Sequence, residues 1–278
     1  MALQKFTYTK KNDLQILSDF IANKLTISKK KVKHLLDSRR VFVNKRRIWI
    51  ASYQLNHGDM IEIISKETEP FDVQEGNILF RDDYYLIVSK PPNIVTNGEE
   101  SLEYKLRVFF KDNRIRAVHR LDKNTSGVVI FAMNKDGFEQ MKPLFKVNLI
   151  KKVYRVIVKG SLGKRLFTID TPLNGQKAVT HIQLLKRGGN ASYLEVNTDT
   201  GRTHQIRIHL ASAGYPVMGE TEYNRKPVEG QLHRQIQRQM LHAYQISFVH
   251  PYTQKCVSVT AEIPDDFKQC LKTFHLTE

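Results

Sequence analysis

Most of the chain after residue 78 is a series of short apolar runs separated by turn-forming residues. The runs over residues 127–132 and 153–158 are rich in β-branched and aromatic side chains, which is typical of buried strands. Helical spacing is rarer and occurs over residues 103–110 and 136–142. Because strands and helices do not alternate regularly, this pattern predicts an α+β body with a mixed, largely antiparallel sheet.

The first part of the chain has a pattern of its own. Ser28 is a favourable N-cap for a helix that begins at Lys29, and the apolar residues that follow at helical spacing give this helix a face to bury. A strand over residues 40–44 and a basic turn over residues 45–47 come next. These elements predict a small α/β module.

A change in composition separates the two patterns. Residues 67–77 are acidic and polar and are interrupted by Pro70 and Gly76, which is typical of a linker. We therefore expect a small domain over residues 1–66 and a larger domain over residues 78–278, joined by this linker. A length of 278 residues is consistent with two domains.

The chain is strongly basic. It contains 44 Lys and Arg against 28 Asp and Glu, a net charge of +16, and more than half of this excess lies in residues 1–66. Such an excess favours a nucleic-acid partner over an anionic membrane surface. We predict that the helix start and the basic turn contact phosphates, although a charge run is more often a solvated face. The side chains concerned are Lys29, Lys30, Lys33, Arg46 and Arg47.

Composition also excludes several classes of protein. The sequence has no run of about 20 apolar residues that would predict a membrane span, and its first residues lack the apolar core of a secretory signal. The two cysteines, Cys256 and Cys270, are too few and too far apart for a disulfide framework or a zinc knuckle, and the 10 histidines form no ligand set. We expect a cytoplasmic protein with reduced thiols and no metal.

The most distinctive chemistry lies in the stretch His119-Arg-Leu-Asp-Lys-Asn-Thr-Ser-Gly127, directly before a predicted strand. Arg120 and Lys123 flank Asp122 and favour its ionised form. An ionised carboxylate on a rigid loop can act as a nucleophile or as an electrostatic stabiliser. A structural ion pair in a turn explains these residues about equally well.

A second polar cluster is Thr200-Gly-Arg-Thr-His-Gln-Ile-Arg-Ile-His-Leu210. Thr203 is suited to cap a helix that runs through Ala213, with Gly214 at its C-terminal end. On this helix, Arg207 is a candidate partner for a carboxylate at the sheet edge. A surface arginine is the weaker alternative, because the segment is otherwise apolar and compact.

Residues 17–64 resemble the S4 RNA-binding domain. The matching segments are Ile27-Ser-Lys-Lys-Lys-Val-Lys-His-Leu-Leu36, Val41-Phe-Val-Asn44 and His57-Gly-Asp-Met-Ile-Glu-Ile63. The family usually has Gly after Val-Asn, where this chain has Lys45. The resemblance implies a small fold of helices and a hairpin that lies against structured RNA.

The larger part of the chain is similar to pseudouridine synthases of the RluA type, which act on large-subunit ribosomal RNA and some tRNAs. The shared motifs follow the family's order over residues 82–251. They are Asp83-Tyr-Tyr-Leu-Ile-Val-Ser-Lys-Pro-Pro92, His119 to Gly127, Lys152-Val-Tyr154 with Val158-Lys-Gly160, Gly201-Arg-Thr-His-Gln-Ile-Arg207, and Leu241-His-Ala243 with Phe248-Val-His-Pro251. The run Asn93-Ile-Val-Thr-Asn-Gly98 departs from the family, at an edge of the site that bears on substrate choice.

This resemblance implies an isomerisation of uridine in RNA without a cofactor. The N1–C1′ bond breaks, the uracil turns, and C5 bonds to C1′. Asp122 is then the catalytic carboxylate, Arg207 the arginine that pairs with it, and Tyr154 the tyrosine that contacts the target base. Whether Asp122 attacks the sugar, attacks the base or removes a ribose proton stays open. Further RNA contacts are expected from His119, from Arg120 in the space that the extruded base leaves, and from Leu241 against the uracil face.

We expect the partner to be large-subunit ribosomal RNA, with tRNA as the alternative, and the protein to be a monomer. A second function is a non-catalytic RNA-binding ribosome assembly factor on the same scaffold. The presence of Asp122, Arg207 and Tyr154 favours the enzyme over that factor. A third function, a nucleoside or glycoside hydrolase, needs a pair of carboxylates, and the sequence has no second acid near the Asp122 motif.

Overall fold

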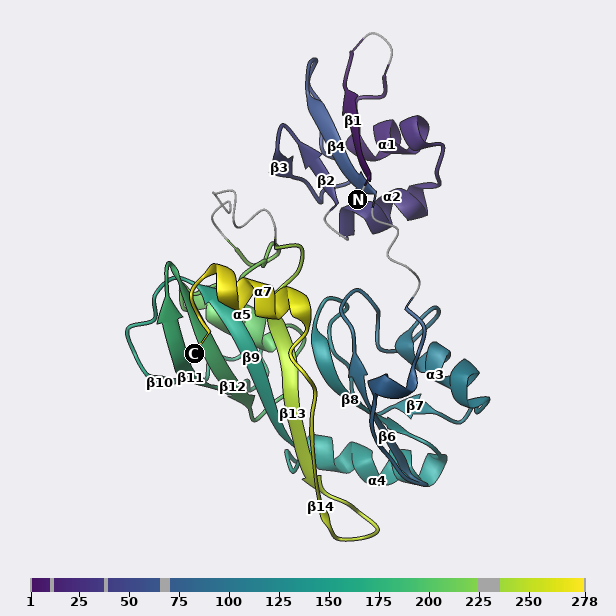
Figure 1. Ribbon diagram of the computed structural model, residues 1–278, viewed down its shortest axis with the longest axis vertical. Helices are drawn as coiled ribbons and strands as arrows, with labels where there is room; N and C mark the ends of the chain where they lie inside the picture. Colours follow the sequence, from purple (N-terminus) through teal and green to yellow (C-terminus); the bar gives the residue numbers. More distant parts are fainter. Residues whose placement is uncertain (1, 11–12, 38–39, 66–70, 225–235, 278) are drawn as a thin grey trace. The chain divides into compact units, whose positions relative to one another are not determined.

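The computed structural model describes residues 2–10, 13–37, 40–65, 71–224 and 236–277. The chain divides into two compact units, Met1–Phe71 and Asp72–Glu278 (Figure 1). The division falls within residues 67–77, the stretch expected to be a linker, of which residues 67–70 lie outside the described residues.

The first unit combines a four-stranded sheet with two helices. The sheet is antiparallel throughout and has the strand order β1-β4-β2-β3. Its elements are β1 (Ala2–Thr7), α1 (Leu17–Leu25), α2 (Lys29–Asp37), β2 (Val41–Val43), β3 (Arg46–Arg47) and β4 (Met60–Ser65). The predicted N-cap is confirmed, because the Ser28 hydroxyl accepts a hydrogen bond from the Lys31 N–H at 3.3 Å.

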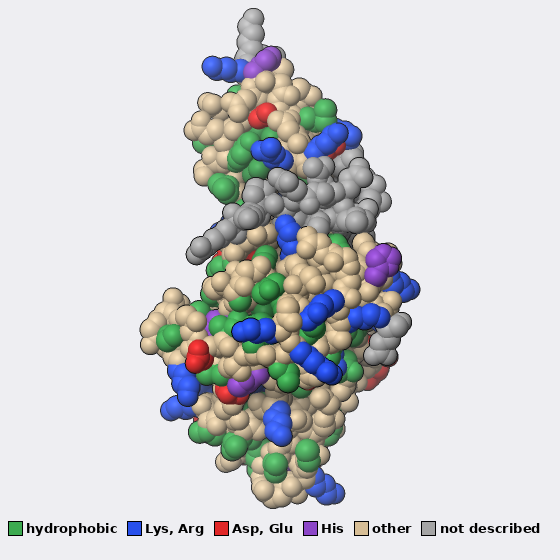
Figure 2. Space-filling model, turned by 90° about the vertical axis from the view of Figure 1, so that its left-hand side faces the viewer, with side chains coloured by type: hydrophobic (Ala, Val, Ile, Leu, Met, Phe, Trp, Pro, Cys, Tyr) green, Lys and Arg blue, Asp and Glu red, His purple; other side chains and the backbone are tan. Residues whose placement is uncertain are grey.

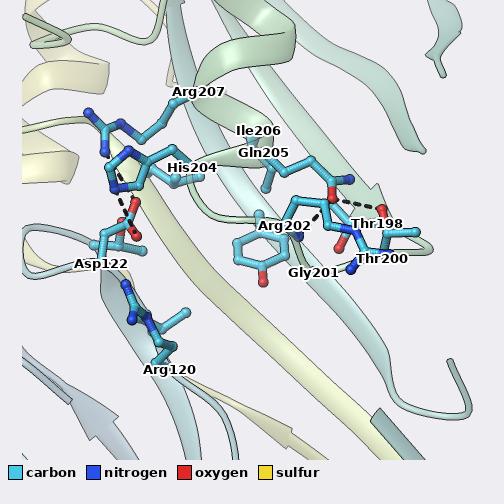
Figure 3. A pocket seen from close by; sticks show the side chains of 14 residues that line it. Arg120, Asp122, Thr198, Thr200, Gly201, Arg202, His204, Gln205, Ile206 and Arg207 are labelled. Carbon is cyan, nitrogen blue, oxygen red and sulfur yellow. Dashed lines mark hydrogen bonds and ion pairs between the residues drawn. The ribbon is translucent and has the colours of Figure 1, made fainter. Parts of the chain in front are cut away.

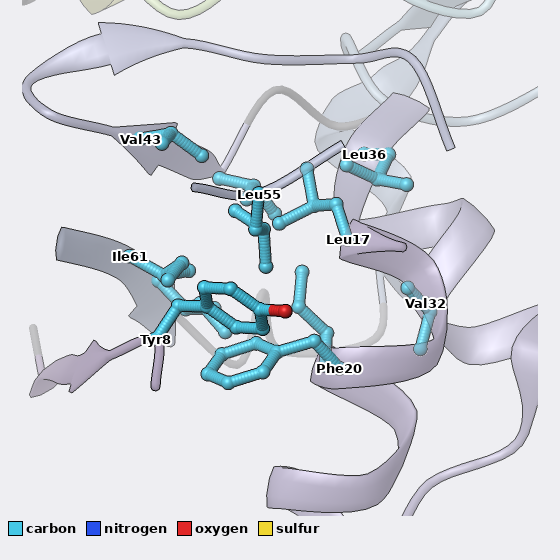
Figure 4. Close-up of a cluster of buried hydrophobic side chains, with 11 residues drawn as sticks. Tyr8, Leu17, Phe20, Val32, Leu36, Val43, Leu55 and Ile61 are labelled. Atoms are coloured by element: carbon cyan, nitrogen blue, oxygen red, sulfur yellow. The ribbon is translucent and has the colours of Figure 1, made fainter. Parts of the chain in front are cut away.

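The core of the first unit lies between the helices and the sheet (Figure 4). Phe20 of α1 and Val32 and Leu36 of α2 are fully buried, together with Val43 and Ile61 of the strands. The apolar stripe predicted for α2 is therefore the face that packs on the core, and its lysines are left on the solvent side.

The predicted basic turn is displaced by one residue. Arg46 pairs with Val43 across the hairpin, so the turn consists of Asn44 and Lys45, and the two arginines form β3. Asn44 has φ 50° and Lys45 has φ 64°. Two positive φ angles in a two-residue hairpin turn are the requirement that usually selects glycine at the second position.

The second unit is built on a ten-stranded mixed sheet. Its main path has the order β10-β11-β12-β9-β13-β8-β6-β5, with β14 paired to β13 and β7 paired to β8. The strands are β5 (Ile78–Arg81), β6 (Tyr85–Lys90), β7 (Arg116–Ala117), β8 (Ser126–Ala132), β9 (Lys151–Lys159), β10 (Leu166–Ile169), β11 (Thr180–Gly188), β12 (Ala191–Thr198), β13 (Leu241–Val249) and β14 (Cys256–Thr260). All pairings are antiparallel except β8–β13, as the apolar pattern predicts.

Helices cover both faces of this sheet. In the part of this unit that the structure describes they are α3 (Leu102–Phe110), α4 (Lys135–Lys146), α5 (Gln205–Ser212) and α7 (Asp265–Thr273), and η1 (Glu75–Asn77) is a short 3-10 turn. Successive side chains of β9 point to opposite faces. Val156 packs in a cluster with Leu210 of α5, whereas Ile157 packs in a cluster with Phe267 of α7. Helices α5 and α7 therefore lie on opposite faces of the same strands (Figure 1).

The parallel junction between β8 and β13 is short and tight. Only two residue pairs form it, His242 with Ser126 and Ala243 with Gly127. Gly127 has φ +117°, and a Cβ atom at this position would lie 2.1 Å from the carbonyl oxygen of Ala243. Glycine is therefore required where these two strands meet. The loop that carries Asp122 enters the sheet at this junction.

Candidate active site

An open pocket lies beside the β8–β13 junction (Figure 3). The loop before β8, strand β9, the start of α5 and the start of β13 all contribute to it. Five of the residues singled out from the sequence line it together: Arg120, Asp122, Tyr154, Arg207 and Leu241. Residues far apart in the chain thus meet at one place.

The loop that carries Asp122 is anchored on both sides of that residue. The Thr96 hydroxyl accepts from the N–H of Leu121 and donates to its carbonyl, each at 3.1 Å. The Lys123 carbonyl accepts from Lys90 Nζ at 3.0 Å, and the Asn124 carbonyl accepts from an Nη of the buried Arg238 at 3.1 Å. Asp122 is therefore presented on a backbone with few degrees of freedom. Thr96 lies in the run over residues 93–98.

Lys90 is the central anchor of this region. Its side chain is fully buried, and its Nζ donates to the carbonyls of Pro91, Ile94 and Lys123. Burial, together with the nearby charge of Arg238, lowers the pKa of Lys90 to about 7. Three carbonyl acceptors favour the ammonium form, because a neutral amine has only two hydrogens to donate.

Arg207 connects Asp122 to two further carboxylates. Its Nη1 lies 3.3 Å from Asp122 Oδ2, its Nε lies 2.6 Å from Glu220 Oε2, and its Nη2 lies 3.0 Å from Glu222 Oε2. Burial alone would lower the pKa of the guanidinium, but the hydrogen bonds and charge of Glu220 raise it, with Asp122 and Glu222 adding to the effect. Arg207 therefore remains a cation beside Asp122.

Glu220 is the buried counterpart of Arg207. Its side chain has no solvent exposure, and it also accepts hydrogen bonds from the backbone N–H groups of Thr221 and Glu222. Burial works against its charge, but the hydrogen bonds from Arg207 hold its pKa below the usual value. A two-point contact between a buried carboxylate and a guanidinium fixes the direction in which Arg207 points.

The sequence has no second acid next to the Asp122 motif, but the fold brings two further acids close to Asp122. Glu220 and Glu222 reach the site from the segment after α5, far along the chain from Asp122. No local pattern marks these two acids in the sequence. A hydrolytic pair is nevertheless not favoured, because Glu220 is fully buried and both acids are occupied by Arg207.

The predicted cap of helix α5 is also wrong. The helix begins at Gln205 and ends at Ser212, and its N-cap is His204 rather than Thr203. The Gln205 side-chain oxygen instead accepts from the Thr200 hydroxyl and from the Arg202 N–H. His204 has φ +55°, and Figure 3 shows its ring above Asp122.

Tyr154 and Leu241 come from the neighbouring strands β9 and β13. Burial, with a smaller contribution from the charge of Asp122, raises the pKa of Tyr154 to about 12. Its phenol therefore stays protonated at neutral pH. Leu241 is 4% exposed and gives the pocket an apolar wall. Arg120 is exposed and lies on the same side of the pocket as Asp122 (Figure 3).

His119 does not line this pocket. Its Nε2 accepts a hydrogen bond from the Ile130 N–H at 3.0 Å, and its ring lies 4.7 Å from that of Phe145. Burial, with the charge of Lys152, lowers the pKa of His119 to about 3, so the ring is neutral. The residue fastens the start of the loop to β8 and α4.

The basic residues predicted to contact RNA lie in the first unit. Lys29, Lys30 and Lys33 are exposed on α2, and Lys29 pairs with Asp19 at 2.8 Å. Arg46 is exposed on β3, whereas Arg47 is partly buried and lies over the ring of Phe42. Lys and Arg side chains are also spread over the face of the second unit in Figure 2.

Within the described ranges, no helix is long and apolar enough to cross a membrane.

Comparisons with known proteins agree on one class. The sequence model of the family described as RNA pseudouridylate synthase matches residues 84–212. The chain is 32% identical to an uncharacterized RNA pseudouridine synthase of Aquifex aeolicus, with 87% of both chains covered. It is 28% identical to the ribosomal large subunit pseudouridine synthase C of Vibrio cholerae, with 92% of both chains covered.

A solved structure supports the same fold. The human protein named RNA Pseudouridylate Synthase Domain Containing 4 matches with a TM-score of 0.61 and 21% identity, covering 72% of this chain and 93% of that one. Fold and relatives together define an RNA-modifying enzyme. The chain belongs to the RNA pseudouridylate synthase family, and it isomerises uridine in RNA to pseudouridine. The family predicted from the sequence motifs is thereby confirmed.

Proposed function

We propose that the pocket around Asp122 is the active site and that Asp122 is the catalytic carboxylate. The observation that carries this proposal is the contact between Asp122 and Arg207, which is itself held by the buried Glu220. The guanidinium of Arg207 places a fixed positive charge beside the Asp122 carboxylate, where charge develops during the reaction. Asp122 then acts on the ribose or on the base, and the proposal holds for either chemistry.

The other pocket residues receive roles around the target nucleotide. A uridine must leave its base stack before a carboxylate can reach it, which costs a few kcal/mol. We assign Arg120 to the space that the base vacates, because it is exposed beside Asp122. Leu241 covers the uracil face and Tyr154 contacts the base, since both line the same pocket. His119 keeps a structural role.

For the substrate, we propose large-subunit ribosomal RNA. The Vibrio cholerae relative carries that substrate in its name and aligns over 92% of both chains. The first unit would act as an S4-like RNA-binding domain through Lys29, Lys30, Lys33, Arg46 and Arg47, and the second as the catalytic domain. We further propose that the protein acts as a monomer in the cytoplasm, with tRNA as the alternative substrate.

Tritium release tests the assignment of Asp122. The substrate is cellular RNA labelled with 5-tritiated uridine in a host that lacks the native gene. Bond formation at C5 expels the tritium, so the wild-type protein is expected to release it and Asp122→Asn is expected to release none. Because Asp122 performs chemistry rather than binding, the variant should bind this RNA within about twofold of wild type.

The possible outcomes separate the candidate functions. Equal release by both proteins would show that another group is the catalytic carboxylate. Tight RNA binding without release from ribosomal RNA, tRNA or assembling ribosomes would favour the assembly factor. Release from tRNA alone would reject ribosomal RNA as the substrate.

A further inference from the structure

His204 has a backbone conformation that its position in a helix does not explain. It is the N-cap of α5, where an extended conformation is usual, yet its φ is +55° and its ψ is 20°. Its side chain makes no capping hydrogen bond to the helix. Other described residues with positive φ end helices, as Thr26 and Lys111 do, or form turns. His204 differs because it stands at the start of a helix and lines the pocket.

The conformation brings the ring onto the second oxygen of Asp122. Arg207 Nη1 faces Asp122 Oδ2 at 3.3 Å, and His204 Nε2 faces Asp122 Oδ1 at 3.5 Å. Each oxygen of the carboxylate thus faces a different side chain (Figure 3). His204 lines the same pocket as Asp122.

The far side of the ring is held as well. His204 Nδ1 lies 2.7 Å from the Tyr223 hydroxyl and 3.6 Å from Glu222 Oε2. The Tyr223 hydroxyl lies 3.0 Å from Glu222 Oε1, and its ring lies under the guanidinium of Arg207 at 5.1 Å. A closed ring of contacts therefore runs from Asp122 through His204, Tyr223, Glu222 and Arg207 back to Asp122.

The hydroxyl of Tyr223 decides where the imidazole carries its hydrogens. The hydroxyl has a single hydrogen, and it donates this hydrogen to Glu222 Oε1. It therefore accepts from an N–H at His204 Nδ1. In the imidazolium form, Nε2 carries a second N–H, and this N–H faces Asp122 Oδ1.

We propose that His204 is a positioning residue of the synthase reaction, which holds the free oxygen of Asp122 and is itself oriented by Tyr223. This proposal rests on the proposed role of Asp122. Arg207 and His204 together fix the rotation of the carboxylate plane, which Arg207 alone leaves free. Misplacing a reacting group by about 1 Å can cost a hundredfold in rate.

Kinetics of three variants test this role, with the tritium assay used at varied RNA concentration. His204→Ala should lower kcat by about 10- to 100-fold and leave the apparent KM within about twofold. His204→Gln keeps an N–H donor near the position of Nε2, so it should recover at least half of that loss on a logarithmic scale. Tyr223→Phe keeps the ring under Arg207 but loses the hydroxyl, and its kcat should lie between wild type and His204→Ala.

A stability measurement separates positioning from simple structural support. His204→Gly relieves the left-handed backbone, so the Tm should stay equal or rise by about 2 °C while kcat falls as in His204→Ala. A residue that only supports the fold would lower Tm and kcat together.

Each outcome has one meaning. A wild-type kcat in His204→Ala would overturn the positioning role and leave Asp122 as assigned. A raised KM with an unchanged kcat would make His204 a substrate-binding contact and would also overturn it. Equal kcat values for His204→Ala and His204→Gln would show that the donor has no role. If wild-type protein releases no tritium, the proposed function and the role of His204 fall together.

Discussion

The charged pair that orients Asp122 and the basic side chains of the first unit are organised in opposite ways. Arg207, which lines the pocket, is 3% exposed, and its partner Glu220 is not exposed at all, so each holds the other in one orientation. In the first unit, the basic surface (Lys29, Lys30, Lys33, Arg46 and Arg47) consists mainly of exposed side chains, and Lys29 is 78% exposed.

This difference separates two contributions to one reaction. Buried, paired charges have a fixed geometry, which is what a developing charge in a transition state needs. Exposed basic side chains can move at little energetic cost and attract RNA from any direction. They therefore contribute to RNA affinity but do not position the reacting groups. We therefore expect changes in the pocket to alter kcat and stability, and changes in the basic surface to alter RNA affinity and its dependence on salt.

Removing the charge of Glu220 should have the largest effect on stability. Glu220→Gln leaves the buried Arg207 without its two-point partner, and we expect the free energy of unfolding to fall by about 3 kcal/mol. This value is at the low end for a broken buried ion pair, because Arg207 keeps Asp122 and Glu222. Urea unfolding followed by far-UV circular dichroism measures it.

Glu222→Gln is the matched control for this prediction. Glu222 also contacts Arg207, but its side chain is half exposed, so its loss should cost less than about 1 kcal/mol. Equal costs for the two variants would remove the distinction that we draw between buried and exposed partners of Arg207.

Neutralising three of the four lysines of α2 should have the next largest effect, on RNA binding only. For Lys29→Gln, Lys30→Gln and Lys33→Gln combined, we expect RNA affinity at physiological salt to fall by about 10- to 100-fold. The slope of log affinity against log salt should shrink by about two to three, because each of the three lost phosphate contacts removes about 0.7 to 0.9. The value of kcat at saturating RNA should not change. A lower kcat with unchanged affinity would assign these lysines to the chemistry instead.

The smallest predicted effect concerns the hairpin turn. Lys45 has φ 64°, so Lys45→Gly should raise the stability of the first unit by about 1 kcal/mol. The same change removes a charge at the hairpin tip and should weaken RNA binding by less than about tenfold. Denaturation followed by the fluorescence of Trp49, the single tryptophan of the chain, reports on this unit.

Lys45→Ala separates the two causes in this prediction. It removes the charge but keeps a Cβ atom in the left-handed region, so it should weaken RNA binding without stabilising the unit. A gain in stability from Lys45→Ala equal to that from Lys45→Gly would show that charge repulsion with the arginines, and not the backbone, limits this turn.

Elements whose conformation is determined by neighbouring residues could be predicted from the sequence. The strands over residues 127–132 and 153–158 were predicted because β-branched residues favour a pleated, buried surface, and both lie within observed strands. Ser28 caps α2 through a contact three residues along the chain. Asp122 and Arg207 were singled out because each stands in a dense polar motif, and the structure brings them within 3.3 Å.

The residues that hold the site in place could not be predicted in the same way. Lys90 and Arg238 act on the Asp122 loop from distant parts of the chain, and Glu220 acts on Arg207 from 13 residues away. Nothing in their local sequence marks these three residues as buried. The cap of α5 was misplaced for a related reason. Thr203 has the better capping side chain, but tertiary contacts to Asp122 and Tyr223 accompany a left-handed conformation at His204.

The pocket lies across the short parallel junction between β8 and β13, so its residues come from both sides of that junction. Asp122 enters from the β8 side, whereas Tyr154 and Arg207 belong to the β9–β13 side, and only two residue pairs join the strands between them. At this junction there is no room for a methyl group between Gly127 and Ala243. A side-chain carbon at residue 127 would push β8 away from β13. The Asp122 carboxylate would then move away from Arg207 and His204, although the added atom contacts neither of them. The alignment of the active-site residues therefore depends on residue 127 having no side chain.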